Sequence, residues 1–507
     1  MPIEYLINLK GKKKDFPHYW ELCIGSCHAA TVLREDVRNQ IRKAHEECGF
    51  QYLRFHGLFD DDMSVVIGGM IPGQSQISFY NIDCIIDFLL DIGMKPFVEI
   101  GFMPELLASG KQTCFHYKGN VTMPADDEKW KELIHLFAEH LLERYGKKEV
   151  SQWFFEVWNE PNLNFFFDGT QEDYFHLYEI TARELKAVDS CFRVGGPATS
   201  VNAWIPEFRS YCEGNGVPLD FITTHHYPND DPLSTMGMNG PGKKGEGMSE
   251  EAMEQMKKMP PEELQKLIAQ YFSSETENPR DIMYQMTSKA KEEAGTYPLY
   301  YTEWNGAVEF DTSYQAAFVI HTLAHNENLV EGYSYWTVSD IFEEQGMKPE
   351  PFKNEFGIQT NHGIRKPVYH VFKELHLAGA ERLEVVGEHR TVEVLALTDG
   401  DTTTVFVYNH DIVRRDIKTE EVNLVLKGKV TAISKAVIDE EHCNPKKVWE
   451  DMGSPVYLSK SQLAEIEAAS HLEFSDVAIS QGNDEQTVEL LLQPEAVVVL
   501  KIKEMER

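Results

Sequence analysis

The sequence lacks the features of several large protein classes. No stretch approaches the ~18 unbroken apolar residues that a membrane span requires. The first residues, MPIEYLINLKGKKKDF, contain neither the apolar core nor the small-residue cleavage site of a secretory signal. The eight cysteines show no CxxC spacing, and zinc patterns such as HExxH are missing. We therefore expect a cytoplasmic protein with reduced cysteines and with no metal and no other cofactor.

Positive charge is also scarce. Lysine and arginine number 48 against 82 aspartates and glutamates, which gives a formal net charge of −34. Such a surface repels phosphate backbones and anionic lipids. The charge therefore argues against nucleic acid and membrane partners, leaves an uncharged small molecule open as a ligand, and is explained most simply by solubility.

Apolar residues, in contrast, are plentiful: 42% of the 507 residues are hydrophobic, enough for two domains with large cores. From about residue 20 to 340, short apolar runs alternate with amphipathic helical stretches. Eight runs read as strands: Trp20–Cys27, Tyr52–Gly57, Pro96–Phe102, Trp153–Trp158, Phe192–Gly196, Phe221–His226, Leu299–Trp304 and Gly332–Trp336. This alternation predicts an α/β fold, a (β/α)8 TIM barrel.

The pattern changes after Lys366-Pro367, where β-rich runs are separated by polar turns. They predict a C-terminal all-β sandwich domain. We place the catalytic barrel at residues 17–378 and the accessory sandwich at 379–507. Residues 1–16 contain a strand-like stretch that could join the sandwich.

An insertion interrupts the barrel after its sixth strand. Residues 228–279 are rich in methionine, lysine and glutamate, and they leave the barrel on the face where active sites form. The insertion could shape substrate entry or an oligomer contact, and a plain surface loop is an equally good interpretation.

The fourth strand ends in a candidate catalytic residue. The apolar run through Val157 leads directly into Trp158-Asn159-Glu160, and Pro161 ends the strand because it has no backbone donor. A carboxyl at the barrel rim, near a tryptophan, is placed to have a raised pKa and to protonate a leaving group. The alternative is a rim glutamate in a salt bridge.

The seventh strand, Leu299–Trp304, also carries an acidic residue at its end, Glu303. In a barrel, the ends of strands four and seven face each other across the mouth. Two carboxyl groups there suit glycoside hydrolysis, because one protonates the glycosidic oxygen and the other attacks the anomeric carbon. Retention of configuration requires a separation of ~5–5.5 Å and inversion ~6.5–9.5 Å, and the sequence leaves that distance open.

Six segments together carry a family resemblance: Arg54–Gly57 (RFHG), Phe115–Thr122 (FHYKGNVT), Trp158–Asn162 (WNEPN), Thr302–Asn305 (TEWN), Trp336–Glu344 (WTVSDIFEE) and Gly363–Pro367 (GIRKP). In order and spacing they resemble the retaining barrel glycosidases of clan A and, more narrowly, glycoside hydrolase family 39, the β-xylosidase family. The resemblance spans the barrel and the start of the following domain.

The resemblance implies that Glu160 is the general acid/base and Glu303 the nucleophile. It also implies that Asn159 binds the hydroxyl next to the anomeric carbon. The residues it suggests for the sugar pocket are His56, His225, Tyr227, Trp336, Glu343 and Glu344, with Phe115 and Phe166 as further candidates for the wall. These residue types agree with the roles, since tyrosine can orient the nucleophile and tryptophan offers a platform for a sugar ring.

The implied reaction is release of terminal xylose from xylo-oligosaccharides by double displacement. Around the sixth strand, however, the family's xylosidases commonly read Arg-His-Ala-Tyr, where this chain has Thr224-His225-His226-Tyr227. Another exo-glycosidase of the family, acting on arabinosyl, galactosyl or glucosyl ends, therefore stays open. A non-catalytic sugar-binding barrel is the alternative from another class. Transglycosylation would use the same carboxyl groups, and a homo-oligomer is also left open.

Two groups of polar residues have structural interpretations. His56, His225 and His226 could suggest a metal cluster, but neighbouring strand residues point to opposite faces, so only one of the adjacent pair can enter the mouth. We therefore predict no metal here. Glu99 and Glu156, inside strands, are expected to be structural carboxylates, with Glu99 in a buried ion pair.

Overall fold

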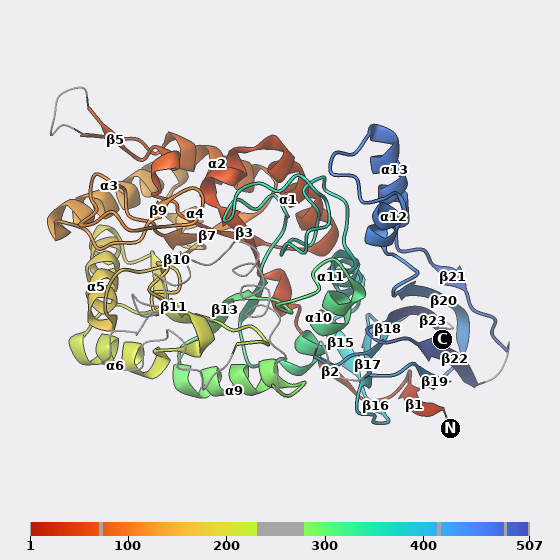
Figure 1. Cartoon of the computed structure of the whole chain (residues 1–507). Coiled ribbons are helices and arrows are strands. Elements are labelled where there is room, and N and C mark those ends of the chain that lie inside the picture. The colour runs from red at the N-terminus through yellow and green to blue at the C-terminus, as the bar shows by residue number, and fades with distance from the viewer. Residues whose placement is uncertain (1, 70–74, 231–277, 413–416, 481–483, 505–507) are drawn as a thin grey trace, which may run out of the picture.

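Eight parallel strands close into a barrel in the computed structural model, which describes residues 2–69, 75–230, 278–412, 417–480 and 484–504 (Figure 1). In barrel order they are β3 (Cys23–His28), β4 (Tyr52–His56), β7 (Lys95–Ile100), β10 (Phe154–Val157), β11 (Arg193–Thr199), β12 (Phe221–His225), β13 (Leu299–Trp304) and β14 (Gly332–Tyr335). Each coincides within a few residues with a strand expected from the apolar pattern. The predicted (β/α)8 barrel is confirmed.

A helix follows each barrel strand. These helices are α1 (Glu35–Cys48), α2 (Tyr80–Asp91), α3 (Asp127–Tyr145), α5 (Gln171–Val188), α6 (Ile205–Asn215), α9 (Ile282–Ala294), α10 (Ser313–His325) and α11 (Pro367–Leu377). Local sequence defines their ends. For example, α5 begins with a capping box in which Thr170 and Asp173 each accept the other's backbone N–H.

Smaller elements decorate the connections. β5 (Val66–Gly68) and β6 (Ser75–Ile77) form a hairpin that projects beyond the barrel in Figure 1. β8 (Thr113–Cys114) and β9 (Gly119–Asn120) pair after β7, and α4 (Lys147–Val150) precedes β10. The β8–β9 turn carries Phe115 and Tyr117, which reach the barrel mouth.

The barrel interior is apolar at its N-terminal end and polar above. Phe97, Phe154 and Phe221 form the lower layer with Cys23, and the rings of Phe97 and Phe154 stack at 4.7 Å. Because strand side chains alternate, the next inward positions bring polar residues such as Arg54 to the centre. The aromatic layer closes the bottom of the barrel, so the C-terminal mouth is the face where a ligand can enter.

The second part of the chain forms two sheets beside the barrel, at the lower right of Figure 1. One sheet has the order β16-β1-β19-β22 and the other β2-β15-β17-β18-β23-β20-β21. Their bounds are β1 (Ile3–Asn8), β2 (Lys13–Asp15), β15 (Glu381–Leu383), β16 (Val385–Val386), β17 (Val392–Thr398), β18 (Thr402–Asn409), β19 (Glu420–Lys427), β20 (Val430–Ile438), β21 (Ser475–Asp476), β22 (Glu485–Leu492) and β23 (Val497–Glu504). Alternate inward side chains of both sheets share one core.

The N-terminal strand belongs to this β-domain. β1 runs parallel to β19, with Ile3 opposite Val422 and Asn8 opposite Lys427, and both chain ends lie in the β-domain (Figure 1). Between the two parts, α11 ends at Leu377 and β15 begins at Glu381. The boundary that we place at 378/379 lies in this connection and stays a prediction.

Two helices that the sequence analysis does not anticipate lie between β20 and β21. They are α12 (Pro445–Asp451) and α13 (Lys460–Ala469), above the sheets in Figure 1. Their signals are local: Asn444 caps α12 ahead of a proline, and Ser459 forms a capping box with Gln462. The helices bury only a small apolar cluster, which includes Trp449 and Ile466, and their short apolar pattern is therefore weak.

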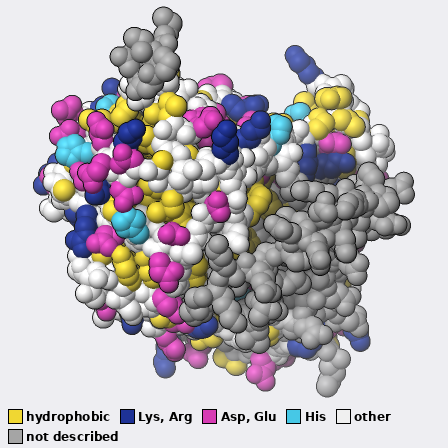
Figure 2. All heavy atoms as spheres, turned by 60° about the vertical axis from the view of Figure 1, so that its left-hand side comes forward, with side chains coloured by type: hydrophobic (Ala, Val, Ile, Leu, Met, Phe, Trp, Pro, Cys, Tyr) yellow, Lys and Arg dark blue, Asp and Glu magenta, His cyan; other side chains and the backbone are white. Residues whose placement is uncertain are grey.

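The surface agrees with the acidic composition. Figure 2 shows acidic side chains spread over this face of the molecule, with basic and hydrophobic side chains between them. Among the described residues, no helix is long and apolar enough to cross a membrane. Most of the predicted insertion at 228–279 lies outside the described residues. Its ends are joined by the Asn278 side chain, which donates to the carbonyl oxygens of Pro228 and Asp230.

Candidate active site

A buried arginine organises the floor of the barrel mouth. Arg54, on β4, donates from Nε to Glu156 Oε2 (2.6 Å) and from Nη1 to Glu303 Oε1 (2.7 Å). Its Nη2 contacts Asn159 Oδ1 and Glu99 Oε2, both at 2.9 Å. The Arg54 guanidinium therefore forms ion pairs with three carboxyl groups. Burial raises the pKa of Glu99 to about 7, even though the charge of Arg54 opposes the change.

Glu303 is held on both oxygens. Arg54 binds Oε1, and the hydroxyl of Tyr227 donates to Oε2 at 2.8 Å. His56 Nε2 lies 3.5 Å from Oε1. These contacts fix the direction of the carboxylate and aim it into the mouth, as a nucleophile requires.

A break in strand register allows Glu303 to point inward. Thr302 faces the interior, because its hydroxyl donates to Glu156 Oε1 at 2.8 Å. Strict alternation would then turn Glu303 outward. The pairing of β12 with β13 slips between Thr224 and His225, so that His225 lies opposite Glu303. This irregularity brings both side chains into the barrel.

Glu160 lies opposite, after the end of β10. Its backbone has a positive φ of 43°, and its N–H donates to the carbonyl of Ala198 at 2.8 Å. The side chain is 8% exposed, and its Oε1 lies 3.0 Å from Nδ1 of His225. Burial raises the pKa of Glu160 to about 7, against the lowering effect of the Arg54 charge. A large share of Glu160 therefore carries a proton at neutral pH.

A chain of hydrogen bonds through His225 favours the protonated form of Glu160. Burial lowers the pKa of His225 to about 4, so the ring is neutral near pH 7. Thr302 uses its one proton on Glu156 and must accept from His225 Nε2, 3.0 Å away. The neutral ring then presents an unprotonated Nδ1 to Glu160, which favours the protonated form of that carboxyl.

The two glutamates are close together. One carboxylate oxygen of Glu160 and one of Glu303 lie within 4.8 Å of each other. This spacing agrees with the ~5–5.5 Å of retaining enzymes, whereas inversion needs room for a water at ~6.5–9.5 Å. His225 Nδ1 lies 3.0 Å from Glu160 Oε1 and 3.8 Å from Glu303 Oε2. By distance alone, the same three residues could also accept a metal ion.

His56 and Trp336 lie side by side on one wall of the mouth. Their ring centroids are 4.7 Å apart, and His56 Nδ1 lies 2.6 Å from Glu99 Oε2. Trp336 rests against Gly25, where a Cβ atom would come within 2.3 Å of the indole. A flat ring with only a small exposed fraction, 4%, can act as a platform at the bottom of a sugar site.

Aromatic residues form another wall. The ring of Phe115 lies 5.3 Å from the ring of Phe166, and equally far from those of Phe165 and Tyr117. Tyr117 in turn stacks on His28 at 3.8 Å. The structure thus brings together Phe115 and Phe166, as predicted, and adds two rings that the sequence analysis does not select.

The two consecutive glutamates after β14, Glu343 and Glu344, have different neighbours. The Glu343 carboxylate lies 3.5 Å from Arg34 Nη1 and 3.8 Å from His28 Nε2, so it faces the Arg34 guanidinium and the His28 ring. Glu344 lies nearer the catalytic pair: burial, followed by the charges of Glu303 and Glu160, raises its pKa well above the ordinary value. Its carbonyl also accepts from the backbone N–H of His116, which fastens the β8–β9 turn.

Sequence reasoning finds only part of this network. The expected buried ion pair of Glu99 is confirmed by its contact with Arg54. The central position of Arg54 and the link from Glu156 through Thr302 to His225 are not foreseen. The available signal is a charged residue at an inward position of an apolar strand, at 54, 99 and 156 alike.

A family model and two sequence relatives show the family of the chain. A model described as Glycosyl hydrolases family 39 matches residues 5–480. A β-xylosidase of Caldicellulosiruptor saccharolyticus is 45% identical over 497 residues, covering 96% of this chain and 95% of that protein. A β-xylosidase of Geobacillus stearothermophilus is 34% identical over 477 residues, covering 90% and 87%.

Solved structures show the same likeness. A monomeric β-xylosidase from Caulobacter crescentus CB15 superimposes with a TM-score of 0.79 at 30% identity, covering 99% of this chain and 100% of that one. More distantly, the α-L-iduronidase of Mus musculus is 26% identical over 467 residues, covering 82% of this chain and 66% of that protein.

Proposed function

The chain belongs to family 39 of the glycosyl hydrolases, and from this premise we propose that it is a retaining, exo-acting β-D-xylosidase. The observation that carries the mechanism is the facing pair Glu160 and Glu303, with oxygens within 4.8 Å of each other. The relatives named β-xylosidase support the choice of sugar.

In the first step we assign the acid role to Glu160 and the nucleophile role to Glu303. The protonated Glu160 gives its proton to the glycosidic oxygen while a carboxylate oxygen of Glu303 forms a bond to the anomeric carbon. The bond to the leaving sugar breaks, and a glycosyl-enzyme intermediate remains. In the second step Glu160 takes a proton from water, which attacks the anomeric carbon and releases Glu303.

Asn159 is proposed to bind the hydroxyl next to the anomeric carbon. Its Oδ1 accepts from Arg54, so the amide NH2 group is the end left for a sugar oxygen. A hydrogen bond there strengthens as charge develops in the transition state. Trp336, His56 and the aromatic wall around Phe115 would enclose the terminal xylose, with His225, Tyr227 and Glu344 beside the reacting centre. Phe166 completes the wall, and Glu343 would act at the edge of the site.

A uronic acid substrate, as the name of the mouse relative would suggest, fits this site less well. Its carboxylate needs a cationic partner. Arg54 already binds Glu99, Glu156 and Glu303 and is fully buried. Lys118, in the β8–β9 turn, is exposed to solvent. A neutral sugar needs no cationic partner, so Arg54 can keep its three carboxyl groups.

The experiment is hydrolysis of a panel of p-nitrophenyl α- and β-glycosides, with proton NMR of the xylose that is first released from the β-xyloside. We expect the β-xyloside to be the best substrate and the initial product to be the β-anomer. Glu303→Gln should be inactive, while Glu128→Gln, an exposed glutamate on α3, serves as the matched control. An α-anomeric first product would contradict retention, and preference for another sugar would contradict only the xylose assignment.

Action inside the cell on imported xylo-oligosaccharides, and the oligomeric state, remain predictions. Cell fractionation with an antibody and sedimentation of the purified chain test them separately from the enzymatic assay.

A further inference from the structure

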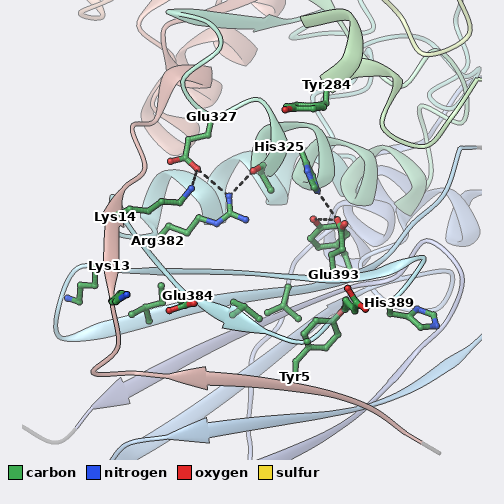
Figure 3. A pocket seen from close by; sticks show the side chains of 18 of the residues that line it. Tyr5, Lys13, Lys14, Tyr284, His325, Glu327, Arg382, Glu384, His389 and Glu393 are labelled. Atoms are coloured by element: carbon green, nitrogen blue, oxygen red, sulfur yellow. Dashed lines mark hydrogen bonds and ion pairs between the residues drawn. The ribbon is translucent and has the colours of Figure 1, made fainter. Parts of the chain in front are cut away.

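A second group of ligand-type side chains lies between the barrel and the β-domain, beside the pocket in Figure 3. His321 and His325 lie one turn apart on α10, and Glu393 comes from β17. His321 Nδ1 and His325 Nε2 lie 2.9 and 3.2 Å from the same oxygen, Oε2 of Glu393. All three ligand atoms lie within 4.8 Å of one another.

We propose that His321, His325 and Glu393 bind a divalent transition-metal ion, with zinc as the best fit. Two imidazoles and one carboxylate, with a position left for water, are a donor set that zinc accepts. Zinc lies ~2.0–2.2 Å from such ligands, so neighbouring donors around a tetrahedral centre are ~3.3 Å apart. The observed 2.9 and 3.2 Å need to widen by only a few tenths of an ångström.

The nitrogen atoms that would bind the metal face a carboxylate oxygen in this structure. His321 Nδ1 and His325 Nε2 lie 2.9 and 3.2 Å from Glu393 Oε2. A bound ion would replace the protons in these contacts, and each neutral ring would then carry its proton on its other nitrogen.

The site is accessible. His325 and Glu393 line a pocket of about 880 Å3 together with Tyr284, Tyr408 and Glu327. Figure 3 shows His325 reaching from its helix toward Glu393, with Tyr284 above. The His325 side chain is 39% exposed, so an ion and its bound water can enter from the pocket.

Charges around Glu393 tune the site. Arg280 Nη1 lies 2.9 Å from Oε1, the oxygen that the histidines do not approach, and the hydroxyl of Tyr408 donates to Oε2 at 2.8 Å. These contacts orient the carboxylate, as second-layer partners do in metal sites. The Arg280 charge also weakens cation binding, so we expect a reversible site rather than a permanently loaded one.

The test uses the full chain after treatment with a chelator. Titration calorimetry with zinc chloride should give one ion per chain, and cobalt(II) should give a visible absorption band that one equivalent of zinc removes. His325→Gln should weaken zinc binding at least ~10-fold, since loss of even an outer partner costs that much in metal sites. His389→Gln, in the same pocket but outside the trio, should bind as the parent does.

Activity distinguishes this site from the catalytic one. Zinc bound at His321, His325 and Glu393 should leave xyloside hydrolysis unchanged. Zinc at Glu160, His225 and Glu303, the other such group within 4.8 Å in the described part of the chain, should abolish it. No binding by the parent chain at 100-fold excess of zinc over protein would overturn the proposal. So would equal affinity of His325→Gln and the parent.

Discussion

The raised pKa of Glu160 predicts how the enzyme responds to pH. A carboxyl with a pKa of about 7 is half protonated at pH 7. At its ordinary value of 4.5, only about 0.3% of the molecules would carry the proton at that pH. Burial therefore gives roughly a 150-fold larger population of the acid form at neutral pH. Because the acid form is lost as pH rises through the folded pKa, kcat/KM for xylobiose should fall about tenfold per pH unit above pH 7.

The assay compares two substrates between pH 5 and 9. Xylobiose has a poor leaving group and needs the proton of Glu160. The dinitrophenolate of a dinitrophenyl β-xyloside is a good leaving group and departs without a proton. We expect the decline above pH 7 for xylobiose and a much weaker decline for the aryl substrate. Glu160→Gln should lower kcat/KM for xylobiose at least ~100-fold, in keeping with the 10²–10⁴-fold that acid catalysis contributes. The rate of the first step with the aryl substrate should fall far less.

Two results would refute this reasoning. If kcat/KM for xylobiose already begins to fall as the pH rises toward 6, burial does not raise the pKa of Glu160. Equal losses of Glu160→Gln in the first step for both substrates would show that Glu160 does not protonate the leaving group. Burst kinetics of dinitrophenol release isolate that first step from turnover of the intermediate.

Three further substitutions test the surroundings. Tyr227→Phe removes one of the two hydrogen bonds to the Glu303 oxygens and should lower kcat/KM for the aryl xyloside about 10–100-fold with little change in thermal unfolding, since such a bond is worth ~1.5–3 kcal/mol. Gly25→Ala places a methyl group within 2.3 Å of the Trp336 ring and should raise KM for xylosides, measured against an unchanged circular dichroism spectrum. Arg54→Leu leaves three buried carboxyl groups without their cation and should destabilise the fold by ~3–5 kcal/mol; a thermal unfolding midpoint equal to that of the parent would contradict the central role of Arg54.

The fold and the positions of Glu160 and Glu303 at the barrel mouth were predictable because their signals are local. Each barrel strand is a short apolar run, and Glu160 and Glu303 follow such runs directly. The inward turn of Glu303 was not predictable from alternation, because Thr302 also faces the interior and a register slip between β12 and β13 resolves the conflict. Such a slip depends on pairing between distant strands, which a single sequence does not display.

Contacts between distant elements were equally hidden. The expectation that Glu343 lines the sugar pocket rests on family likeness, whereas the structure directs its carboxylate to Arg34 and His28. Likewise, no sequence spacing connects His321 and His325 with Glu393, because the last residue lies on another domain. Only the packing of α10 against the β-domain brings them together.

The different surroundings of Glu160 and Glu303 support the opposite roles that we propose for two identical side chains with oxygens within 4.8 Å. Donors converge on Glu303 from Arg54 and Tyr227, which hold its oxygens for attack. Glu160 lies beside His225, whose Nδ1 is the acceptor end of a chain that begins at Glu156 and passes through Thr302. Arg54 thus acts on both sides: directly on Glu303, and through Glu156 on the tautomer of the histidine that faces Glu160. Environments that differ in this way assign acid and nucleophile within one buried site.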